Sequence, residues 1–291
     1  MGLMTGSGPF SRKPEGTWNF EVPAPGQAMY VEPIPKRIRV VLNGETIADT
    51  VHAQYVSESG LQPSYYIPRA DVRSEVLEPS DRHTRCPKKG EASYHTLRVG
   101  DRVEEAAAWY YPEPLPGAEA IRDHIAFDFR RMDHWFEEDT EVFTHPKDIY
   151  HRIDVYPSSR HVRVSLDGEP LAESTRAMAL FESNLPPRWY LPREDVSAKL
   201  VSSETVTTCG YKGEANYYSV ELSSGEVVKD IVWYYVEPFH DGAAVKDLLC
   251  FFNEQVDLEV DGEAHGRPKT AWSGGVKGEK PMSAAAGAPP S

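Results

Sequence analysis

The chain has 291 residues, a formal net charge of −14 and a hydrophobic fraction of 40%, with aromatic residues at 11%. This acidic balance argues against nucleic acid or an anionic membrane as the partner, because binding either requires clustered Lys and Arg. The three cysteines have no paired spacing, which predicts no disulfide framework and fits a reducing cytosol. The sequence contains neither a signal-peptide core nor an apolar run of about 18 residues, so we expect a soluble, cytoplasmic protein.

In chain order, residues 1–35 contain several Pro and Gly with little periodicity, which predicts an irregular arm anchored by Trp18 and Phe20. Apolar and polar residues then alternate up to the turn Asn43-Gly44, which is typical of a β hairpin. Further predicted elements of this first domain, over 36–130, are strands at 53–57, 92–99 and 106–111, a polar hairpin region at 78–84, and a short helical turn feeding a strand within 118–129.

The segments of the first domain recur in the second half of the chain. The run C-x-x-K-G-E-A-x-Y begins at Cys86 and again at Cys209. Other matching segments, in the same order, are 38–50 with 162–174, 66–72 with 190–196, and 109–111 with 233–235. A fixed order of matching segments indicates a tandem duplication of a domain of roughly 110 residues, so the second domain spans 161–263.

Two segments lie outside the repeat. Residues 131–160 are acidic and aromatic and contain two Pro, which predicts a linker that packs between the domains. From residue 264 the composition changes to Gly, Pro, Ala and Ser, which predicts a disordered tail over 264–291.

Four motifs of the first copy together resemble one known family, "domain of unknown function 427". They are V-x-x-N-G-E-x-I-A-D-T, Y-x-I-P-R-x-D-V, C-P-x-K-G-x-A-x-Y and A-A-W-x-Y-x-x-P, and the segment 145–154 belongs to the same resemblance. The chain looks like a two-copy form of this family, and the resemblance covers about residues 18–263. It implies a mainly β fold of two tandem antiparallel domains of the beta-tent kind, the architecture of B-type methionine sulfoxide reductases.

The resemblance implies no settled activity. Some catalogues label the family a nucleotidyltransferase, but the sequence has neither a G-S-x-x-x-D-x-D element for Mg²⁺ nor a Gly-rich phosphate loop. The second copy also departs from the motif, since Gly210 replaces Pro87 and Tyr211 replaces Lys88. The equivalence of the two motif segments is therefore an open question at the level of sequence.

The repeated motif places a cysteine three residues before a lysine. An ammonium beside a thiol favours the thiolate, which is the nucleophilic form, and the glycine that follows lets the backbone approach a ligand. This spacing makes Cys86 and Cys209 candidate catalytic nucleophiles, with Lys89 and Lys212 as their electrostatic partners. The structural alternative is a buried cysteine on a strand that enters a tight turn, with the lysine in solvent.

Several polar and aromatic residues are shared by the two copies and are candidates to line a small-molecule pocket. They are Glu58, Tyr66, Arg69 and Trp109 in the first copy, and Glu182, Tyr190, Arg193 and Trp233 in the second. The alternatives are that the arginines are ordinary surface charges and that the tryptophans fill the core.

We expect neither a metal nor a cofactor. A closed zinc site needs four ligands, and each copy has one cysteine at its motif with no partner two residues on. The linker contains a possible carboxylate–imidazole cluster of His145, Asp148, His151 and Asp154, for which a structural role is the alternative.

Three functions remain open at this stage. The first is a small-molecule site in each domain that involves Glu58 and Lys89 and their counterparts. The second is a cysteine-dependent enzyme, and the third is an interaction module that presents an acidic surface without a pocket. The ligand, the reaction, the activity of each copy and the oligomeric state are not indicated by the sequence.

Overall fold

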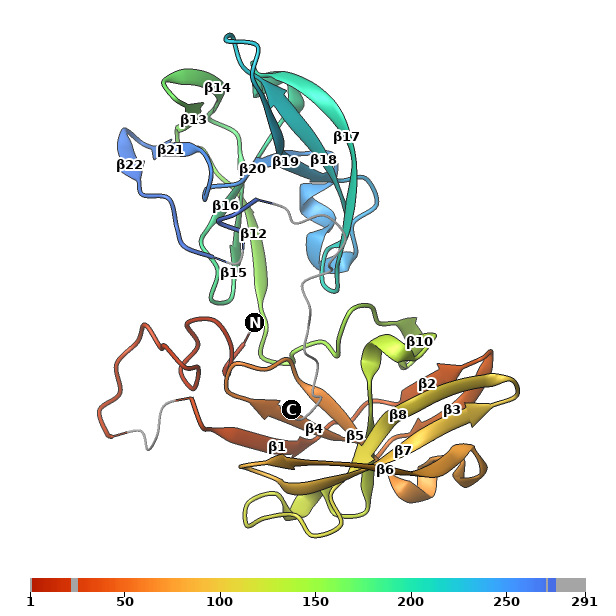
Figure 1. Cartoon of the computed structure of the whole chain (residues 1–291). Helices are drawn as coiled ribbons and strands as arrows, with labels where there is room; N and C mark the ends of the chain where they lie inside the picture. Colours follow the sequence, from red (N-terminus) through yellow and green to blue (C-terminus); the bar gives the residue numbers. More distant parts are fainter. Residues whose placement is uncertain (1, 22–25, 271, 276–291) are drawn as a thin grey trace. The chain divides into compact units, whose positions relative to one another are not determined.

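The computed structural model describes residues 2–21, 26–270 and 272–275. Strands account for 49% of the described residues and helical turns for 8%, so the mainly β fold predicted from the sequence is confirmed. The described residues form two compact units, 2–150 and 151–275, and each unit contains two antiparallel sheets (Figure 1). None of the helical turns in these residues has the length or the apolar character needed to cross a membrane.

The larger sheet of the first unit has seven strands. In spatial order they are β1 (Met29–Pro33), β4 (Gln54–Glu58), β5 (Ser64–Pro68), β9 (His124–Phe127), β8 (Arg102–Tyr110), β7 (Gly90–Val99) and β6 (Leu77–Cys86). Short 3-10 helices lie in the connections: η1 (Arg69–Asp71), η2 (Ser74–Val76) and η3 (Glu119–Ile121). The last of these is the predicted helical turn, and it leads into β9 as expected.

The smaller sheet of the first unit has four strands, and the predicted hairpin forms half of it. In spatial order the strands are β11 (Thr140–Glu141), β10 (His134–Glu137), β2 (Ile38–Leu42) and β3 (Glu45–Thr50), with η4 (Phe129–Arg131) before β10. Asn43 and Gly44 connect β2 to β3 with φ angles of 51° and 73°. Both angles are positive, as a two-residue primed turn requires, which explains the Asn-Gly pair.

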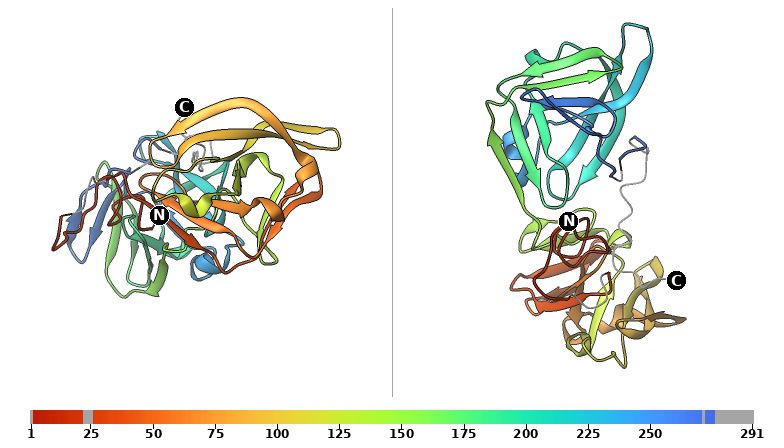
Figure 2. Two further views of the ribbon diagram at one scale, coloured as in Figure 1. Left: turned by 90° about the horizontal axis from the view of Figure 1, so that it is seen from below. Right: turned by 90° about the vertical axis from the view of Figure 1, so that its left-hand side faces the viewer.

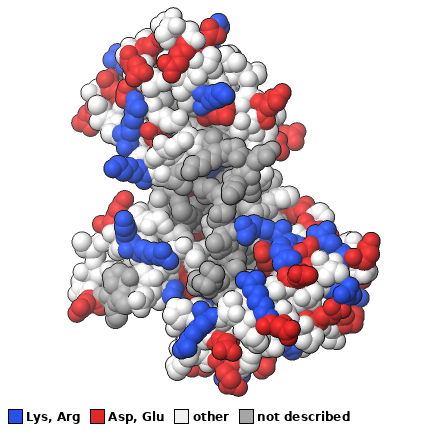
Figure 3. All heavy atoms as spheres, in the orientation of Figure 1, with Lys and Arg blue, Asp and Glu red and all other residues white. Residues whose placement is uncertain are grey.

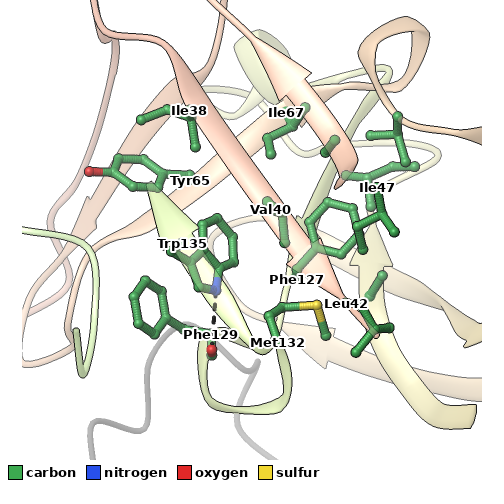
Figure 4. Packing of buried hydrophobic residues seen from close by; sticks show 14 of the residues in the cluster. Ile38, Val40, Leu42, Ile47, Tyr65, Ile67, Phe127, Phe129, Met132 and Trp135 are labelled. Carbon is green, nitrogen blue, oxygen red and sulfur yellow. Dashed lines mark hydrogen bonds between the residues drawn. The ribbon is translucent and has the colours of Figure 1, made fainter. Parts of the chain in front are cut away.

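The main core of the first unit lies between these two sheets. Alternation along β2 turns Ile38, Val40 and Leu42 to the same side, and none of the three is exposed. Trp135 of β10 packs among them, stacks on Phe129 with ring centroids 4.9 Å apart, and donates its indole N–H to the Phe129 carbonyl oxygen at 3.1 Å (Figure 4). The bonded indole nitrogen allows the tryptophan to be buried without an unsatisfied donor.

The second unit repeats this topology strand for strand. Figure 2 shows the ribbon of the chain from two further sides. Its larger sheet has the order β12 (Ile153–Pro157), β15 (Met178–Glu182), β16 (Arg188–Leu191), β20 (Leu249–Phe251), β19 (Val227–Tyr235), β18 (Gly213–Glu221) and β17 (Lys199–Cys209). Its smaller sheet has the order β14 (Glu169–Ser174), β13 (Val162–Leu166), β21 (Asp257–Val260) and β22 (Glu263–His265), and the helical turns are η5 (Arg193–Asp195) and η6 (His240–Val245).

Strand pairing shows which parts of the expected arm and linker are ordered as strands. The arm ends before β1, which pairs with β4, and the predicted linker is divided between the units, since β10 and β11 pair within the first and β12 within the second. The polar segment 78–84 belongs to the continuous strand β6. These strands are short or polar and are held by distant partners, so local alternation does not reveal them.

The tail predicted over 264–291 lies partly outside the described residues. In the described part, β22 extends to His265 and pairs with β21, and Trp272 packs against a cluster of buried residues in the second unit. The first part of this segment therefore belongs to the second unit.

The larger sheet of each unit also buries side chains on its other face, away from the smaller sheet. In the first unit this second face carries Val56, Tyr66, Cys86, Tyr94 and Trp109, among others. In the second unit the corresponding cluster includes Leu180, Tyr190, Tyr217, Trp233 and Cys250. The predicted site residues lie mainly on this face.

Candidate functional site

The repeated motif forms the tight turn that joins β6 to β7 in the first unit and β17 to β18 in the second. Cys86 pairs with Gly90 across the first turn, and Cys209 pairs with Gly213 across the second. The two glycines have φ angles of 104° and 96°, which L side chains rarely adopt. A Cβ atom on Gly90 would lie 3.1 Å from the carbonyl oxygen of Glu113, so the turn requires glycine for both reasons.

In each unit the turn is hydrogen-bonded to the segment that follows β8 or β19. The backbone N–H of Leu115 donates to the carbonyl oxygen of Lys89 at 3.1 Å, and that of Phe239 donates to Lys212 at 3.0 Å. The side chains of Lys89 and Lys212 are buried, with 2% and 9% of their surface exposed. The structural alternative of a motif lysine in solvent is therefore not observed in either unit.

Each buried lysine pairs with the glutamate predicted from the repeat. The Lys89 ammonium donates to Oε1 of Glu58, the last residue of β4, and the Lys212 ammonium donates to Oε2 of Glu182, the last residue of β15. An isolated charge in such a position would be strongly unfavourable, so each partner makes burial of the other possible.

Aromatic side chains surround the pair in the first unit. The Lys89 ammonium lies 5.8 Å from the ring centroid of Tyr66 and 5.6 Å from that of Tyr111. The Trp109 indole N–H donates to the Tyr66 hydroxyl at 3.1 Å, and Trp233 makes the same bond to Tyr190 at 3.0 Å. Ring faces attract a desolvated ammonium, so these rings add to the stabilisation of the charged lysine.

The electrostatic balance keeps these lysines charged. Burial by itself lowers the pKa of Lys89, but the neighbouring Tyr66 and Glu58 outweigh it and raise the pKa above its ordinary value. The pKa of Lys212 is raised as well, because Cys209 and Glu182 outweigh its burial. A lysine held as an ammonium cannot act as a nucleophile or a general base near neutral pH.

The motif cysteines lie on the same face as the lysines but differ in exposure. Because Cys86 pairs with Gly90 and Thr84 with Ala92, the register places Cys86 on the face of Ala92, in the second-face cluster. Cys86 is 2% exposed, whereas Cys209 is half-buried. Cys86 is among the groups that raise the pKa of Lys89, and Cys209 is among those that raise the pKa of Lys212.

The two copies differ in the second cation that reaches the glutamate. In the first, the ammonium nitrogen of Lys88 lies 3.5 Å from Oε2 of Glu58. In the second, Tyr211 occupies the position of Lys88, and Nε2 of His151 lies 3.0 Å from Oε1 of Glu182. The His151 ring also packs on Tyr211, with ring centroids 4.0 Å apart. Where the second copy has Tyr211 instead of a lysine, the imidazole of His151 therefore replaces the second ammonium beside the glutamate.

The environment of Glu182 strongly favours its ionised form. Burial raises the pKa of a carboxyl group, but Lys212 and the hydrogen bond from His151 outweigh it and lower the pKa of Glu182 to about 2. The carboxylate is thus ionised over the whole physiological range of pH.

A second buried ion pair in the second unit was missed by sequence reasoning. The Arg188 guanidinium donates two hydrogen bonds to Glu254, at 2.7 and 2.6 Å, and both residues are buried. The guanidinium carbon lies 5.4 Å from the ring centroid of Trp233 and 5.8 Å from that of Trp272. Comparison of the copies gives no signal for this pair, because the matching positions of the first copy hold Ser64 and Arg130.

The structure does not bring the predicted arginines to this face. Arg69 is exposed and lies over Tyr110, with the guanidinium carbon 4.8 Å from the ring centroid, and its Nη2 lies 3.1 Å from Nε2 of His95. Tyr110 packs against the main core, on the opposite face from Lys89. Arg193 is exposed and lies over Tyr218 in the same way, at 5.2 Å. The shared arginines form a separate feature, and they do not line the candidate site.

The proposed carboxylate–imidazole cluster is not assembled. His145 bonds to the Pro146 carbonyl oxygen, Asp148 accepts from the backbone of Tyr150, and Asp154 pairs with Arg152, while His151 joins Glu182. Within the described ranges, no group of three or more His, Cys, Asp or Glu side chains is arranged to hold a metal ion.

These features define a protein of two tandem all-β domains, each with a buried lysine–glutamate pair beside a bonded Trp–Tyr pair. The chain belongs to the family described as "Domain of unknown function (DUF427)", whose model matches residues 30–138 and again 154–262. The two matched regions confirm the tandem two-copy form that the motifs indicate. No curated protein matches the chain with significance.

The buried pair generates a first prediction, on stability. Replacing Lys89→Met leaves the Glu58 carboxylate buried without its main partner, and we expect a loss of about 3 kcal/mol in the free energy of unfolding. The double variant Glu58→Leu/Lys89→Met removes both charges and should lie within about 1 kcal/mol of wild type. Urea unfolding followed by circular dichroism measures both.

The matched control for this prediction is Lys88→Met, which removes the adjacent and more exposed ammonium and should cost about 1 kcal/mol or less. Equal losses for the Lys89 and Lys88 single variants would contradict a specific pair, as would a double variant less stable than Lys89→Met.

A second prediction concerns acid. Because the folded pKa of Glu182 is lowered from 4.5 to about 2, its stabilising contribution is complete above about pH 4.5 and is lost as the pH falls towards 2. We expect this carboxylate to contribute about 3 kcal/mol to the acid-induced loss of stability. Glu182→Gln should show a shallower dependence of unfolding free energy on pH across this window.

Glu173→Gln serves as the control for the acid experiment, because Glu173 is an exposed carboxylate that pairs with His161 and Arg163. These partners lower the pKa of Glu173, but the group is open to solvent, so Glu173→Gln should change the acid dependence much less than Glu182→Gln does. An identical slope in Glu182→Gln and wild type would refute the assignment of the titration to Glu182.

Proposed function

We propose that each domain binds a small organic molecule on the second face of its larger sheet, against the buried lysine–glutamate pair. The observation that carries the proposal is the repetition of this pair, together with the Trp–Tyr hydrogen bond, in two copies that differ at the adjacent positions Lys88 and Tyr211. A charged pair and phenol groups on an otherwise apolar, aromatic face are the kind of convergent polar groups that orient a ligand.

A purely structural role explains the pair less well. Burial of two charges is unfavourable, and well-packed apolar residues of similar volume support a fold equally well or better. Two copies that have diverged around the pair have nevertheless kept both of its members. A function that needs the ammonium and the carboxylate accounts for this, since apolar residues cannot replace them in it.

The charge of the molecule supports a small ligand over nucleic acid. The net charge is −14, and on the face that Figure 3 shows, Lys and Arg lie among Asp and Glu over the described residues. Counterion release from nucleic acid needs a concentrated basic surface. The three cysteines are free thiols, which supports a reducing, cytoplasmic environment for this function.

A third prediction tests the proposal. A thermal-shift screen of acidic, neutral and basic metabolites on the full chain should yield compounds that raise the melting temperature, because a ligand of the folded state stabilises it. The response should disappear in a variant with Glu58→Leu, Lys89→Met, Glu182→Leu and Lys212→Met, which replaces both pairs by apolar residues. Isothermal titration calorimetry of the hits then gives the affinity and the number of sites.

Arg69→Ala and Arg193→Ala are the controls, because these arginines were predicted from the same repeat but lie on the opposite face. They should leave the ligand response unchanged. A screen without hits, or a response that survives loss of both pairs, would argue against a site at this position.

A specific observation in the second unit favours a second candidate, a cysteine-dependent enzyme. Cys209 is half-buried, and Lys212 lies close enough for the two groups to interact electrostatically. A nearby ammonium stabilises a thiolate, and partial exposure lets a substrate approach it. In this reading Cys209 is the nucleophile and Lys212 its electrostatic partner, with Cys86 and Lys89 in the same roles in the first domain.

A fourth prediction separates this candidate from simple binding. If Cys209 is an activated nucleophile, iodoacetamide at pH 7 alkylates it faster than free cysteine, and Lys212→Met slows the reaction. Cys250 is 0% exposed and provides an internal control that should remain unmodified in the folded chain. Peptide mass spectrometry measures all three; a Cys209 rate at or below that of free cysteine would exclude activation.

A further inference from the structure

The first unit contains a buried hydroxyl group without a partner. Tyr111 follows β8 and is 1% exposed, and its hydroxyl oxygen has no hydrogen-bond partner among the described residues. Buried polar groups in folded proteins are nearly always hydrogen-bonded, because an unmade bond carries the full desolvation penalty. An orphaned hydroxyl therefore indicates a missing acceptor or donor.

The position of Tyr111 assigns this hydroxyl to the candidate site. The Lys89 ammonium lies 5.6 Å from its ring centroid, and the ring of Tyr66 lies 6.4 Å away. Tyr66, Cys86 and Glu58 are among the groups that interact electrostatically with its hydroxyl. Burial, followed by these groups, raises the pKa of Tyr111, so the hydroxyl keeps its proton and is available as a donor.

The charges at this site do not balance. The ammonium groups of Lys89 and Lys88 both reach the carboxylate of Glu58, one on each oxygen. Two cations and one anion leave a net charge of +1 beside an unpartnered donor. A partly buried excess charge attracts an opposite charge more strongly than one in water, because the local dielectric constant is lower.

We infer that the first domain binds a small organic monoanion, whose carboxylate accepts a hydrogen bond from the Tyr111 hydroxyl and pairs with the Lys88 ammonium. This inference deepens the proposed function and rests on it. The apolar part of the ligand packs on the aromatic rings of the second face, which include Tyr66 and Trp109.

Lys88 provides the connection to solvent. Its side chain is 18% exposed, and its ammonium donates to the carbonyl oxygen of Ala28 at 3.4 Å, next to the start of β1. Met29, the first residue of β1, packs against the edge of the same cluster. A ligand reaches the site along Lys88, between the motif turn and β1.

The second domain lacks this arrangement. Tyr211 stands in place of Lys88, so the second ammonium is missing, and His151 is already bonded to Glu182. The additional pair of Arg188 and Glu254 is neutral as a unit. The preference for a monoanion is thus a property of the first domain, which makes the second domain an internal reference.

The test uses three ligands of matched shape and different charge: benzoate, benzamide and benzylamine, each at millimolar concentration and constant ionic strength, with the full chain. Benzoate should raise the melting temperature by several degrees, benzamide less, and benzylamine not at all. Titration calorimetry should give at least a tenfold weaker dissociation constant for benzoate in Lys88→Tyr, which installs the residue of the second copy, and in Lys88→Gln.

The variant Tyr111→Phe distinguishes a tyrosine that binds the ligand from one that only supports the fold. Removal of the orphaned hydroxyl should raise the melting temperature without ligand and weaken benzoate binding at least tenfold. Tyr235→Phe, the matching change in the second copy, should leave the dissociation constant of benzoate within twofold of wild type.

The outcomes separate this inference from the proposed function. If benzamide or benzylamine binds as well as benzoate and the binding depends on Glu58 and Lys89, the monoanion is wrong and the small-molecule site stands. If benzoate binds equally to wild type, Lys88→Gln and Tyr111→Phe, the inference is also overturned. If neither these three ligands nor the metabolite panel binds, both proposals fail together.

Discussion

A buried ammonium has to be paired with a carboxylate, and this constraint governs how the motif turn is arranged in each domain. Lys89 cannot be buried without Glu58, and it reaches Glu58 because the motif turn folds inward at Gly90. The turn is closed by pairing of Cys86 with Gly90 and by the bond from Leu115. One electrostatic requirement thus accounts for the adjacent lysine and glycine that occur twice in the chain.

Duplication has preserved this framework while the chemistry around it has changed. Both units keep the glutamate at the end of the fourth strand of the repeat, the lysine in the turn and the tryptophan bonded to a tyrosine. The second unit exchanges one ammonium for an imidazole and adds a buried arginine–glutamate pair. The two pairs therefore have different basic neighbours, and under the proposed function this difference would favour different ligands in the two domains.

The two faces of the larger sheet in each unit bury different kinds of side chain. One face packs on the smaller sheet and forms the main hydrophobic core, to which Ile38 and Trp135 belong in the first unit. The other buries polar and aromatic groups together, including Lys89 and Tyr66. Because neighbouring residues of a strand point to opposite faces, adjacent positions such as Tyr65 and Tyr66 serve the core and the site respectively.

The sequence by itself determined the duplication, the β class and the Asn-Gly hairpins, because these depend on local alternation and on comparison of the copies. It also placed Glu58 and Lys89 among the shared residues. Only the tertiary structure decided that these two meet, that Arg69 lies on the opposite face, and that β1 and β12 are edge strands held by distant partners. The pair of Arg188 and Glu254 was likewise visible only in the fold. Contacts between segments far apart in sequence arise from strand order and register, which local periodicity does not specify.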